Sequence, residues 1–315
     1  MNIKTIAAIA LSNRDYPDLK AKLEEAARWV RFAARQGADL AVLPEALNHW
    51  RGDGPGNPLA LSYAEAALDD WQNQCAILLD AARESGIAVT VPIRIPVEGG
   101  LANLFFLVRA DGSVAGSYQK LFPVEGELLR GMVPGKPGVI EWEGLKVGGA
   151  ICFDTNYPEV FEQQAALGAE LFLVPSLWPG GTQLNYHAWR YSVPIAIAYP
   201  AWSRIIDITG ADVAGGGYRN ETLRFGFGTP VVMARINFAR VQLANASAAN
   251  RDRVLEAQEY YGDAIEVLFD QPNCMYYLES RQEGLGIPEI LARFGLEERR
   301  AFLRRCGEMA AGSCS

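Results

Sequence analysis

The sequence predicts an α/β protein, mainly because one local pattern recurs along it. At residues 33–45, 81–92 and 165–176, an alanine-rich helical segment ends at a glycine, and a short apolar segment follows that contains or ends at a proline. Glycine is common just after the last turn of a helix, and helices alternating with short strands build layered α/β sheets. The intervals are unequal, so the pattern indicates recurrent αβ structure rather than a solenoid.

Composition favours a soluble, cytoplasmic protein. The chain has 315 residues, 50% of them hydrophobic and 21% charged, which is enough to bury a large core. No apolar run approaches the ~20 residues that a membrane-spanning helix needs. Residues 6–11 are apolar but run directly into a polar segment, so we interpret them as the first strand rather than a signal peptide.

Charge and cysteine usage exclude two further classes. A net charge of −8 without a basic cluster argues against nucleic-acid binding. The five cysteines are odd in number and contain no Cys-x-x-Cys pair, which predicts neither a disulfide framework nor a metal site. They are Cys75, Cys152, Cys274, Cys306 and Cys314. This usage fits a reducing compartment.

The first half of the chain contains two predicted helices and one hairpin. Residues 19–34 and 64–82 place apolar side chains on one helical face, with Cys75 as a core residue of the second helix. Asp111-Gly112 between residues 101–108 and 112–118 is a strong hairpin signal.

The second half continues with strands and ends in helices. We expect strands at 196–199, 204–208 and 230–238 and a glycine loop at 215–217, which no helix follows as a dinucleotide site would require. A turn at 271–273, a helix opening at Ile287-Pro288 and a helical run to Arg304 come last. We therefore divide the chain into residues 1–270 and a C-terminal extension, 271–315, packed on the body or on a partner subunit.

Cys152 is the first candidate for chemistry. Residues 145–151 read as a buried strand, and Pro158 suits the first position of a helix. A sharp strand-to-helix bend between them exposes its side chain at the carboxyl end of a sheet, where α/β folds place ligands. A nucleophile and a buried structural cysteine are both compatible with this position.

Reactive side chains also follow two other strands. Glu45 comes after residues 40–43, and Lys120 comes after residues 113–118. The chain has only two histidines, His49 and His187, neither in a recognisable Cys/His pattern, and we expect a capping or surface role for His187. A nucleophilic Cys152 therefore needs a carboxylate as its base, and we expect burial to raise the pKa of Glu45.

Three segments together resemble the signature motifs of the nitrilase, or carbon–nitrogen hydrolase, superfamily. They are Leu43-Pro44-Glu45, residues 118–123 (Tyr-Gln-Lys-Leu-Phe-Pro) and residues 149–154 (Gly-Ala-Ile-Cys-Phe-Asp), the last followed by Tyr157-Pro158-Glu159. Their order and wide spacing are also similar to the family's, and the resemblance covers roughly residues 3–270. Three ordered motifs on the expected strand ends make this resemblance specific.

The resemblance implies a four-layer αββα sandwich whose subunits pair into an αββα–αββα core. It also implies a second glutamate after the lysine, for which Glu127 is favoured and Glu125 is the competitor. With Glu45, Lys120 and Cys152 this residue would complete the catalytic set, and the N–H of Phe153 would help Lys120 to stabilise an oxyanion. Neither a metal nor an organic cofactor is implied.

Phe153-Asp154 and residues 156–159 look closer to amidases than to nitrilases. We therefore expect hydrolysis of a small amide, ahead of N-carbamoyl and then nitrile substrates, with a non-catalytic oligomer of the same fold as the alternative of a different class. Five residues flank the catalytic set and are predicted to line the pocket: His49, Trp50, Tyr118, Asn156 and Trp178. An apolar helical face at Ile290, Leu291, Phe294 and Phe302 adds to the expectation of a homo-oligomer.

Overall fold

The computed structural model describes residues 2–51, 61–217, 230–244 and 248–312. It divides into two compact units, residues 5–234 and a second unit formed by residues 1–4 with 235–315. The boundary at 234/235 differs from the division at 270 expected from the sequence, because residue 270 lies at the turn of a hairpin inside the second unit. Cys314 lies outside the described residues.

The larger unit contains two six-stranded sheets. The first has the spatial order β12 (Val231–Asn237), β1 (Ile3–Ile9), β2 (Leu40–Val42), β3 (Ala88–Val97), β4 (Gly100–Val108), β5 (Val114–Gln119). The second has the order β11 (Asp212–Gly216), β10 (Ser203–Ile206), β9 (Ile195–Ala198), β8 (Leu171–Pro175), β7 (Leu145–Gly149), β6 (Ile140–Trp142). The strands β1, β2 and β3 are parallel, as are β7, β8 and β9. Carboxyl ends of neighbouring strands therefore meet at one edge of each sheet.

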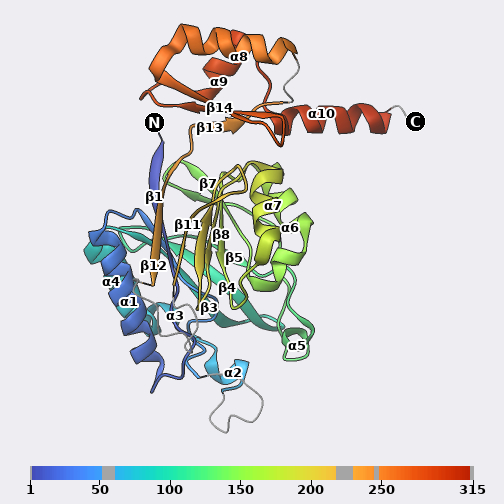
Figure 1. Cartoon of the computed structure of the whole chain (residues 1–315). Coiled ribbons are helices and arrows are strands. Elements are labelled where there is room, and N and C mark those ends of the chain that lie inside the picture. The colour runs from blue at the N-terminus through green and yellow to red at the C-terminus, as the bar shows by residue number, and fades with distance from the viewer. Residues whose placement is uncertain (1, 52–60, 218–229, 245–247, 313–315) are drawn as a thin grey trace. The chain divides into compact units, whose positions relative to one another are not determined.

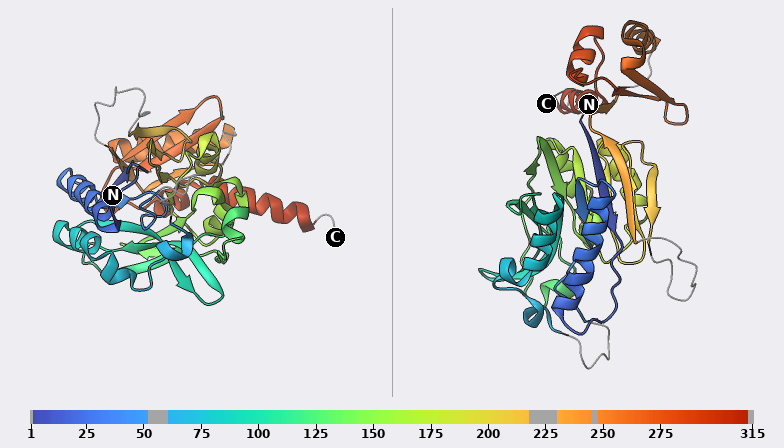
Figure 2. Two further views of the ribbon diagram at one scale, coloured as in Figure 1. Left: turned by 90° about the horizontal axis from the view of Figure 1, so that it is seen from below. Right: turned by 90° about the vertical axis from the view of Figure 1, so that its left-hand side faces the viewer.

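Helices cover the outer faces of both sheets. In Figure 1, α1 (Leu19–Arg35) and α4 (Ala76–Ser85) lie on one side of this unit, and α6 (Pro158–Ala166) and α7 (Gly181–Tyr191) on the other. Figure 2 confirms that α1 stands outside the strands. Inside, an added side chain at Gly149 would lie 2.5 Å from Tyr118 and 2.8 Å from Phe105, so the two sheets approach closely there. The predicted αββα sandwich is confirmed.

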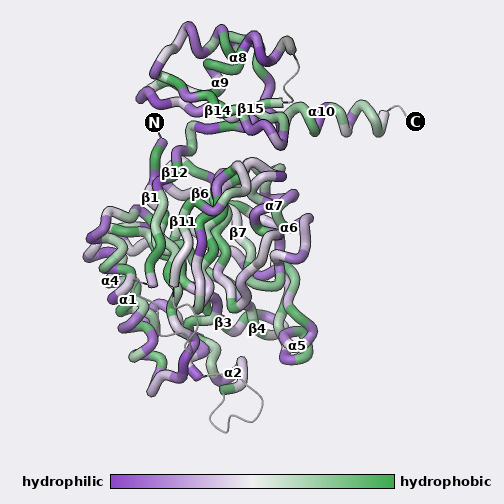
Figure 3. The backbone as a smooth tube through the Cα atoms, in the orientation of Figure 1, coloured by the Kyte–Doolittle hydropathy of each residue, from purple (hydrophilic) through white to green (hydrophobic). Residues whose placement is uncertain are grey.

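The helix predicted at 19–34 is confirmed as α1. Asp18 caps its first turn by accepting the Ala21 N–H at 2.8 Å. Hydrophobic and hydrophilic residues alternate along it in Figure 3, and Leu23 and Val30 on its inner face are fully buried. The amphipathic pattern thus placed this helix correctly.

Two expectations about secondary structure in the larger unit were wrong. Residues 64–82 form three short helices, α2 (Tyr63–Ala66), α3 (Trp71–Gln74) and α4, because Leu68 N–H leaves the helix to donate to the Arg94 carbonyl at 3.0 Å. Gly215 belongs to strand β11 rather than to a loop. Glycine is required nearby because a side chain at Gly216 would lie 2.8 Å from Val232.

The smaller unit has its own core. The sheet β13 (Arg240–Gln242), β15 (Met275–Ser280), β14 (Ile265–Asp270) packs with α8 (Ala248–Tyr261) and α9 (Ile287–Phe294), and the last helix is α10 (Arg299–Gly312). Gly295, with φ of 59°, ends α9 and breaks the helical run expected to Arg304. Ile290, Leu291 and Phe294 pack into this core, so that apolar face finds burial within the chain. The pairing of subunits stays a prediction.

A buried lysine links α1 to the turn that follows β2. Lys22 is 4% exposed, and its ammonium donates to the carbonyl of His49 at 2.7 Å and to that of Ala46 at 3.5 Å. Ala46 adopts the left-handed conformation, with φ of 57°. Burial, with the nearby Arg94 charge, lowers the pKa of Lys22 to about 7.

This lysine makes stability depend on pH. Between pH 7 and the ordinary lysine pKa of 10.5, the unfolded chain binds more protons than the folded chain, so stability rises with pH in this window. Relative to Lys22→Met, the free energy of unfolding of the unaltered chain should rise by on the order of 3 kcal/mol from about pH 7 to pH 10. Urea unfolding at several pH values measures it. The exposed Lys20→Met is the control, and a pH-independent difference for Lys22→Met would contradict the assignment.

Candidate active site

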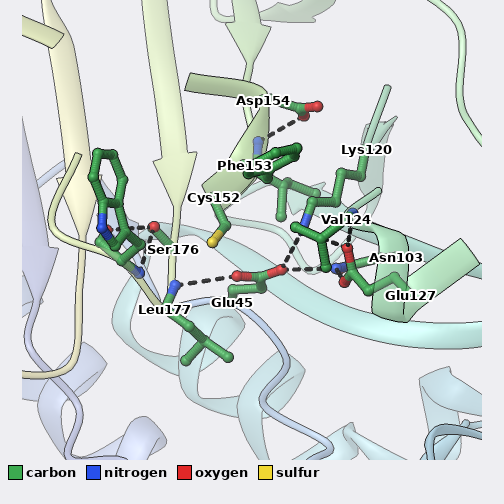
Figure 4. Close-up of polar contacts among 12 residues, drawn as sticks. Glu45, Asn103, Lys120, Val124, Glu127, Cys152, Phe153, Asp154, Ser176 and Leu177 are labelled. Carbon is green, nitrogen blue, oxygen red and sulfur yellow. Dashed lines mark hydrogen bonds and ion pairs between the residues drawn. The ribbon is translucent and has the colours of Figure 1, made fainter. Parts of the chain in front are cut away.

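Four elements of the larger unit supply the residues of the site. Glu45 follows β2, Lys120 follows β5, Glu127 belongs to the short helix α5 (Glu125–Leu128), and Cys152 opens a 3-10 helix (Cys152–Asn156) three residues after the end of β7. Figure 4 shows their side chains turned toward one another. The structure therefore brings together the four residues that the sequence singled out.

Lys120 lies between the two glutamates. Its ammonium nitrogen is 3.1 Å from Glu45 Oε1 and 2.8 Å from Glu127 Oε2, and all three side chains are at most 3% exposed. Glu125, the competitor, is exposed. Burying charges is costly unless they are paired and hydrogen-bonded, so this arrangement requires further partners for each carboxylate.

Asn103 on β4 supplies part of that partnership. Its side-chain amide donates to Glu45 Oε1 at 2.8 Å and to Glu127 Oε1 at 2.9 Å. The backbone carbonyl of Asn103 accepts the backbone N–H of Lys120 at 2.8 Å, so this one residue contacts both glutamates and the lysine. The sequence analysis missed Asn103, although its place on the strand paired with β5 could have indicated it.

The remaining carboxylate oxygens are also occupied. Glu45 Oε2 accepts the Leu177 N–H at 3.1 Å, after β8, and Glu127 Oε2 accepts the Val124 N–H at 3.0 Å. All four oxygens of the two glutamates therefore have a donor, which holds each carboxylate in one orientation.

These contacts decide the protonation states. Burial alone would raise the pKa of Glu45, but Lys120, Arg94 and the Asn103 hydrogen bond together lower it below 4.5. The expectation of a raised pKa for Glu45 was therefore wrong, because the nearby cations outweigh burial. Burial opposes the charge of Lys120, yet Glu45, Glu127 and Cys152 raise its pKa above the ordinary value. Before the reaction, Lys120 is therefore protonated and Glu45 is ionised.

Cys152 sits on a strained bend. Its φ of 48° is the left-handed conformation that side chains other than glycine rarely adopt. Burial and the Glu45 charge raise the pKa of the thiol to about 12, although Lys120 and contacts with Leu177 and Ser176 oppose them. The sulfur points toward the Glu45 carboxylate in Figure 4. At neutral pH the residue is a thiol facing a carboxylate.

Asp154 holds the bend from behind. Its carboxylate accepts the Ile151 N–H at 2.9 Å, the Phe122 N–H at 2.8 Å and the Tyr118 hydroxyl at 2.9 Å. Tyr118, predicted to line the pocket, is 3% exposed and makes this supporting contact. The segment after Lys120 and the segment around Cys152 are thus tied to one carboxylate.

Helix α7 holds the bend from the other side. Thr155 donates to the Cys152 carbonyl at 2.7 Å, Gln183 donates to the Thr155 hydroxyl at 3.1 Å, and His187 Nε2 lies 3.2 Å from the Thr155 carbonyl. The expectation of a capping or surface role for His187 was wrong, since it is 3% exposed and stacks on Phe161 at 4.1 Å. Burial lowers the pKa of His187, which keeps the ring neutral.

The other predicted pocket residues lie at three places. His49 and Trp50 belong to the turn after Glu45, where His49 is buried and its Nε2 lies 3.0 Å from the Leu61 carbonyl. Asn156 is exposed at the end of the 3-10 helix, and Trp178 is 41% exposed after β8. Phe153 is half-buried beside Cys152.

Asn103 offers a test of how the cluster is held. Asn103→Ala should lower the free energy of unfolding by about 1–3 kcal/mol, because two buried carboxylates each lose a charge-assisted hydrogen bond. Urea unfolding near neutral pH measures the loss. Asn185→Ala, which removes hydrogen bonds with Gly210, Arg204 and the half-exposed Asp212, is the control and should cost less, because these groups are closer to solvent. Equal losses for the two variants would contradict the role given to Asn103.

Within the described ranges, no group of three or more histidine, cysteine or acidic residues could hold a metal ion, and no helix is long and apolar enough to cross a membrane. The four free cysteines there form no disulfide. A thiol that faces a carboxylate, with a lysine between two glutamates, is an arrangement capable of nucleophilic catalysis.

The comparisons identify the family. Residues 5–246 match the family described as carbon-nitrogen hydrolase. The chain belongs to this family, which acts on C–N bonds other than peptide bonds. The resemblance stated from the three motifs is thereby confirmed.

Several similar proteins are named amidases. The chain is 26% identical to the deaminated glutathione amidase of Escherichia coli O157:H7 over 61% of this chain and 70% of that protein. It is 31% identical to the deaminated glutathione amidase of Mus musculus over 51% of this chain and 53% of that one. The match to the 2-oxoglutaramate amidase of Bacillus subtilis (strain 168), 26% identical, also spans about half of the relative, 53%.

Solved structures share the fold. An amidase from Nesterenkonia sp. superposes with a TM-score of 0.61 at 23% identity, covering 74% of this chain and 90% of that chain.

Proposed function

We propose that this chain is an amidase that converts a small amide into a carboxylic acid and ammonia through a thioester on Cys152. The observation that carries the proposal is the Cys152 sulfur turned toward the buried Glu45 carboxylate, which is paired with Lys120 at 3.1 Å. The names of the relatives support the reaction class. A purely structural role would be hard to reconcile with this cluster, because apolar residues of similar volume often stabilise a core as well as buried ion pairs do.

Acylation begins with attack of Cys152 on the amide carbon. Because the pKa of the thiol lies far above that of Glu45, little free thiolate exists, and the proton leaves the sulfur for Glu45 as the C–S bond forms. Lys120 and the Phe153 N–H stabilise the negative charge that develops on the carbonyl oxygen. Glu45 then protonates the nitrogen, which leaves as ammonia.

In deacylation Glu45 acts as a base again, this time toward water. The carboxylate accepts a proton from water as the water attacks the thioester, and the thiol recovers its proton when the acid is released. In a mutant of the Nesterenkonia amidase, the acetamide moiety of fluoroacetamide is covalently added at the active-site cysteine. That observation supports a nucleophilic role for Cys152 here. Glu127 keeps Lys120 charged and in place.

The substrate class is tested by ammonia release from a panel of small amides, N-carbamoyl amino acids and nitriles. We expect the amides to give the highest kcat/KM. A panel in which nitriles exceed amides, or in which no compound releases ammonia, would contradict the proposal.

Replacement of Cys152 tests the nucleophile. Cys152→Ala and Cys152→Ser should abolish turnover while the fold is retained, because a hydroxyl is far less nucleophilic and no histidine assists it. Circular dichroism checks the fold, and exposed Cys306→Ser is the control with unchanged activity. Turnover by Cys152→Ala at more than a trace would refute the assignment.

A trapping experiment should distinguish the roles of Glu45 and Glu127. Glu45→Gln should block acylation, because the amide accepts no proton from the thiol, whereas Glu127→Gln should still acylate, more slowly. Intact-protein mass spectrometry after mixing with an amide detects the acyl-enzyme. A Glu45→Gln variant that acylates at the rate of the unaltered enzyme would transfer the base role elsewhere, with exposed Glu125→Gln as the silent control.

A further inference from the structure

Arg94 on β3 places a second buried cation beside the cluster. Its guanidinium NH2 lies 3.9 Å from Glu127 Oε1, and both side chains are 3% exposed. Its NH1 lies 3.2 Å from His49 Nδ1, and its Cζ lies 3.9 Å from the centre of the Tyr63 ring. None of the sequence motifs includes this arginine.

Hydrogen bonding does not explain the buried position of the Arg94 guanidinium. Among the described residues, its buried Nε–H has no acceptor, and its distance to Glu127 exceeds that of a hydrogen bond. Burying a guanidinium that is incompletely paired costs free energy, so its position needs another explanation. Charge supplies one: Lys120 alone would leave Glu45 and Glu127 with one uncompensated negative charge, and Arg94 brings the cluster to two cations and two carboxylates.

The backbone of Arg94 also positions the turn after Glu45. Asn48 in that turn accepts the Arg94 N–H at 3.0 Å and donates to the Arg94 carbonyl at 2.9 Å. The side chain then reaches His49 of the same turn. One residue thus contacts the turn that follows the base and faces the second glutamate.

We propose that Arg94 is a positioning residue for the reaction, whose charge balances Glu127 and Glu45 and keeps the base ionised while its contacts hold the turn behind Glu45. This inference rests on the proposed amidase activity. The Arg94 charge is one of the causes that lower the pKa of Glu45. The other titratable groups that face the cluster or Arg94 are Lys22 on α1, His49 in the turn, Tyr63 on α2, Tyr118 and Lys120 at the end of β5, Glu127 on α5, and Cys152 and Asp154 at the bend.

The sign of the effect follows from this charge. Without the Arg94 charge the Glu45 carboxylate is less stabilised, so the pKa of Glu45 rises and the acid limb of the kcat/KM profile moves to higher pH. An opposite charge at such a distance typically shifts a carboxyl pKa by about one unit or more. A side chain that acted only through packing would lower activity equally at all pH values.

The experiment compares Arg94→Met, Arg94→Gln and Arg94→Lys. Arg94→Gln keeps an amide that can reach His49 and is the second neutral variant if Arg94→Met does not fold. The control is Arg109→Met, since Arg109 donates only to the carbonyls of Val114 and Glu141 among the described residues. Two profiles are measured against pH for each: kcat/KM for a small amide, and the rate of Cys152 alkylation by iodoacetamide, which needs no turnover.

We expect the neutral variants to shift the acid limb of both profiles upward by about one pH unit, while Arg94→Lys and Arg109→Met keep it unshifted. Unshifted limbs in the neutral variants, or the same shift in Arg94→Lys, would overturn the inference. If the unaltered protein hydrolyses no amide, the proposed function fails, and the alkylation profile alone decides the role of Arg94.

Discussion

The buried ion pairing of Lys120 with Glu45 and Glu127 is the constraint on which the rest of the site depends. Three charged side chains at 3% exposure or less are tolerable only if every carboxylate oxygen has a donor. Those donors come from β4, from the residues after β8 and from the segment that leads into α5. Strands of both sheets must therefore end at the same place, and the sandwich architecture provides that convergence.

The same pairing fixes the chemical state of the nucleophile. The thiol loses its proton only with difficulty, because it is buried and because the cations keep the charge on the neighbouring Glu45. The bend at Cys152, with φ of 48°, persists because Asp154 and Thr155 hold it from two sides. A rigid, protonated thiol beside a fixed carboxylate suits an attack in which proton transfer and bond formation occur together.

Local patterns in the sequence predicted the α/β class, α1 and the strand ends that carry Glu45, Lys120 and Cys152, because helical periodicity and turn residues act over short distances. The sandwich arrangement was implied only by the resemblance of three motifs to a known family. They missed the break between α2 and α4, which depends on a hydrogen bond from Leu68 to a residue on β3. The predicted direction of the Glu45 pKa shift was also wrong. Burial could be foreseen from the strand, but Lys120 outweighs it together with Arg94 and Asn103, two residues that reach the site only through sheet pairing.

Contacts between residues far apart in the sequence also explain His187 and the division of the chain. His187 looked polar and exposed, yet α7 turns it inward to Thr155. The division at 270 followed a turn signal that proved to be the tip of the β14–β15 hairpin. Such signals locate turns well but do not say to which core the flanking strands belong.

Cys152 rests as a thiol because it is buried and because Glu45, held by Lys120, carries the negative charge beside it. The ultraviolet thiolate absorbance of the protein, compared with that of Cys152→Ser as pH is raised, measures this protonation state. We expect no thiolate signal from Cys152 across the neutral range, since burial and the Glu45 charge raise the thiol pKa to about 12. A Cys152 thiolate that titrates near or below neutral pH would contradict it.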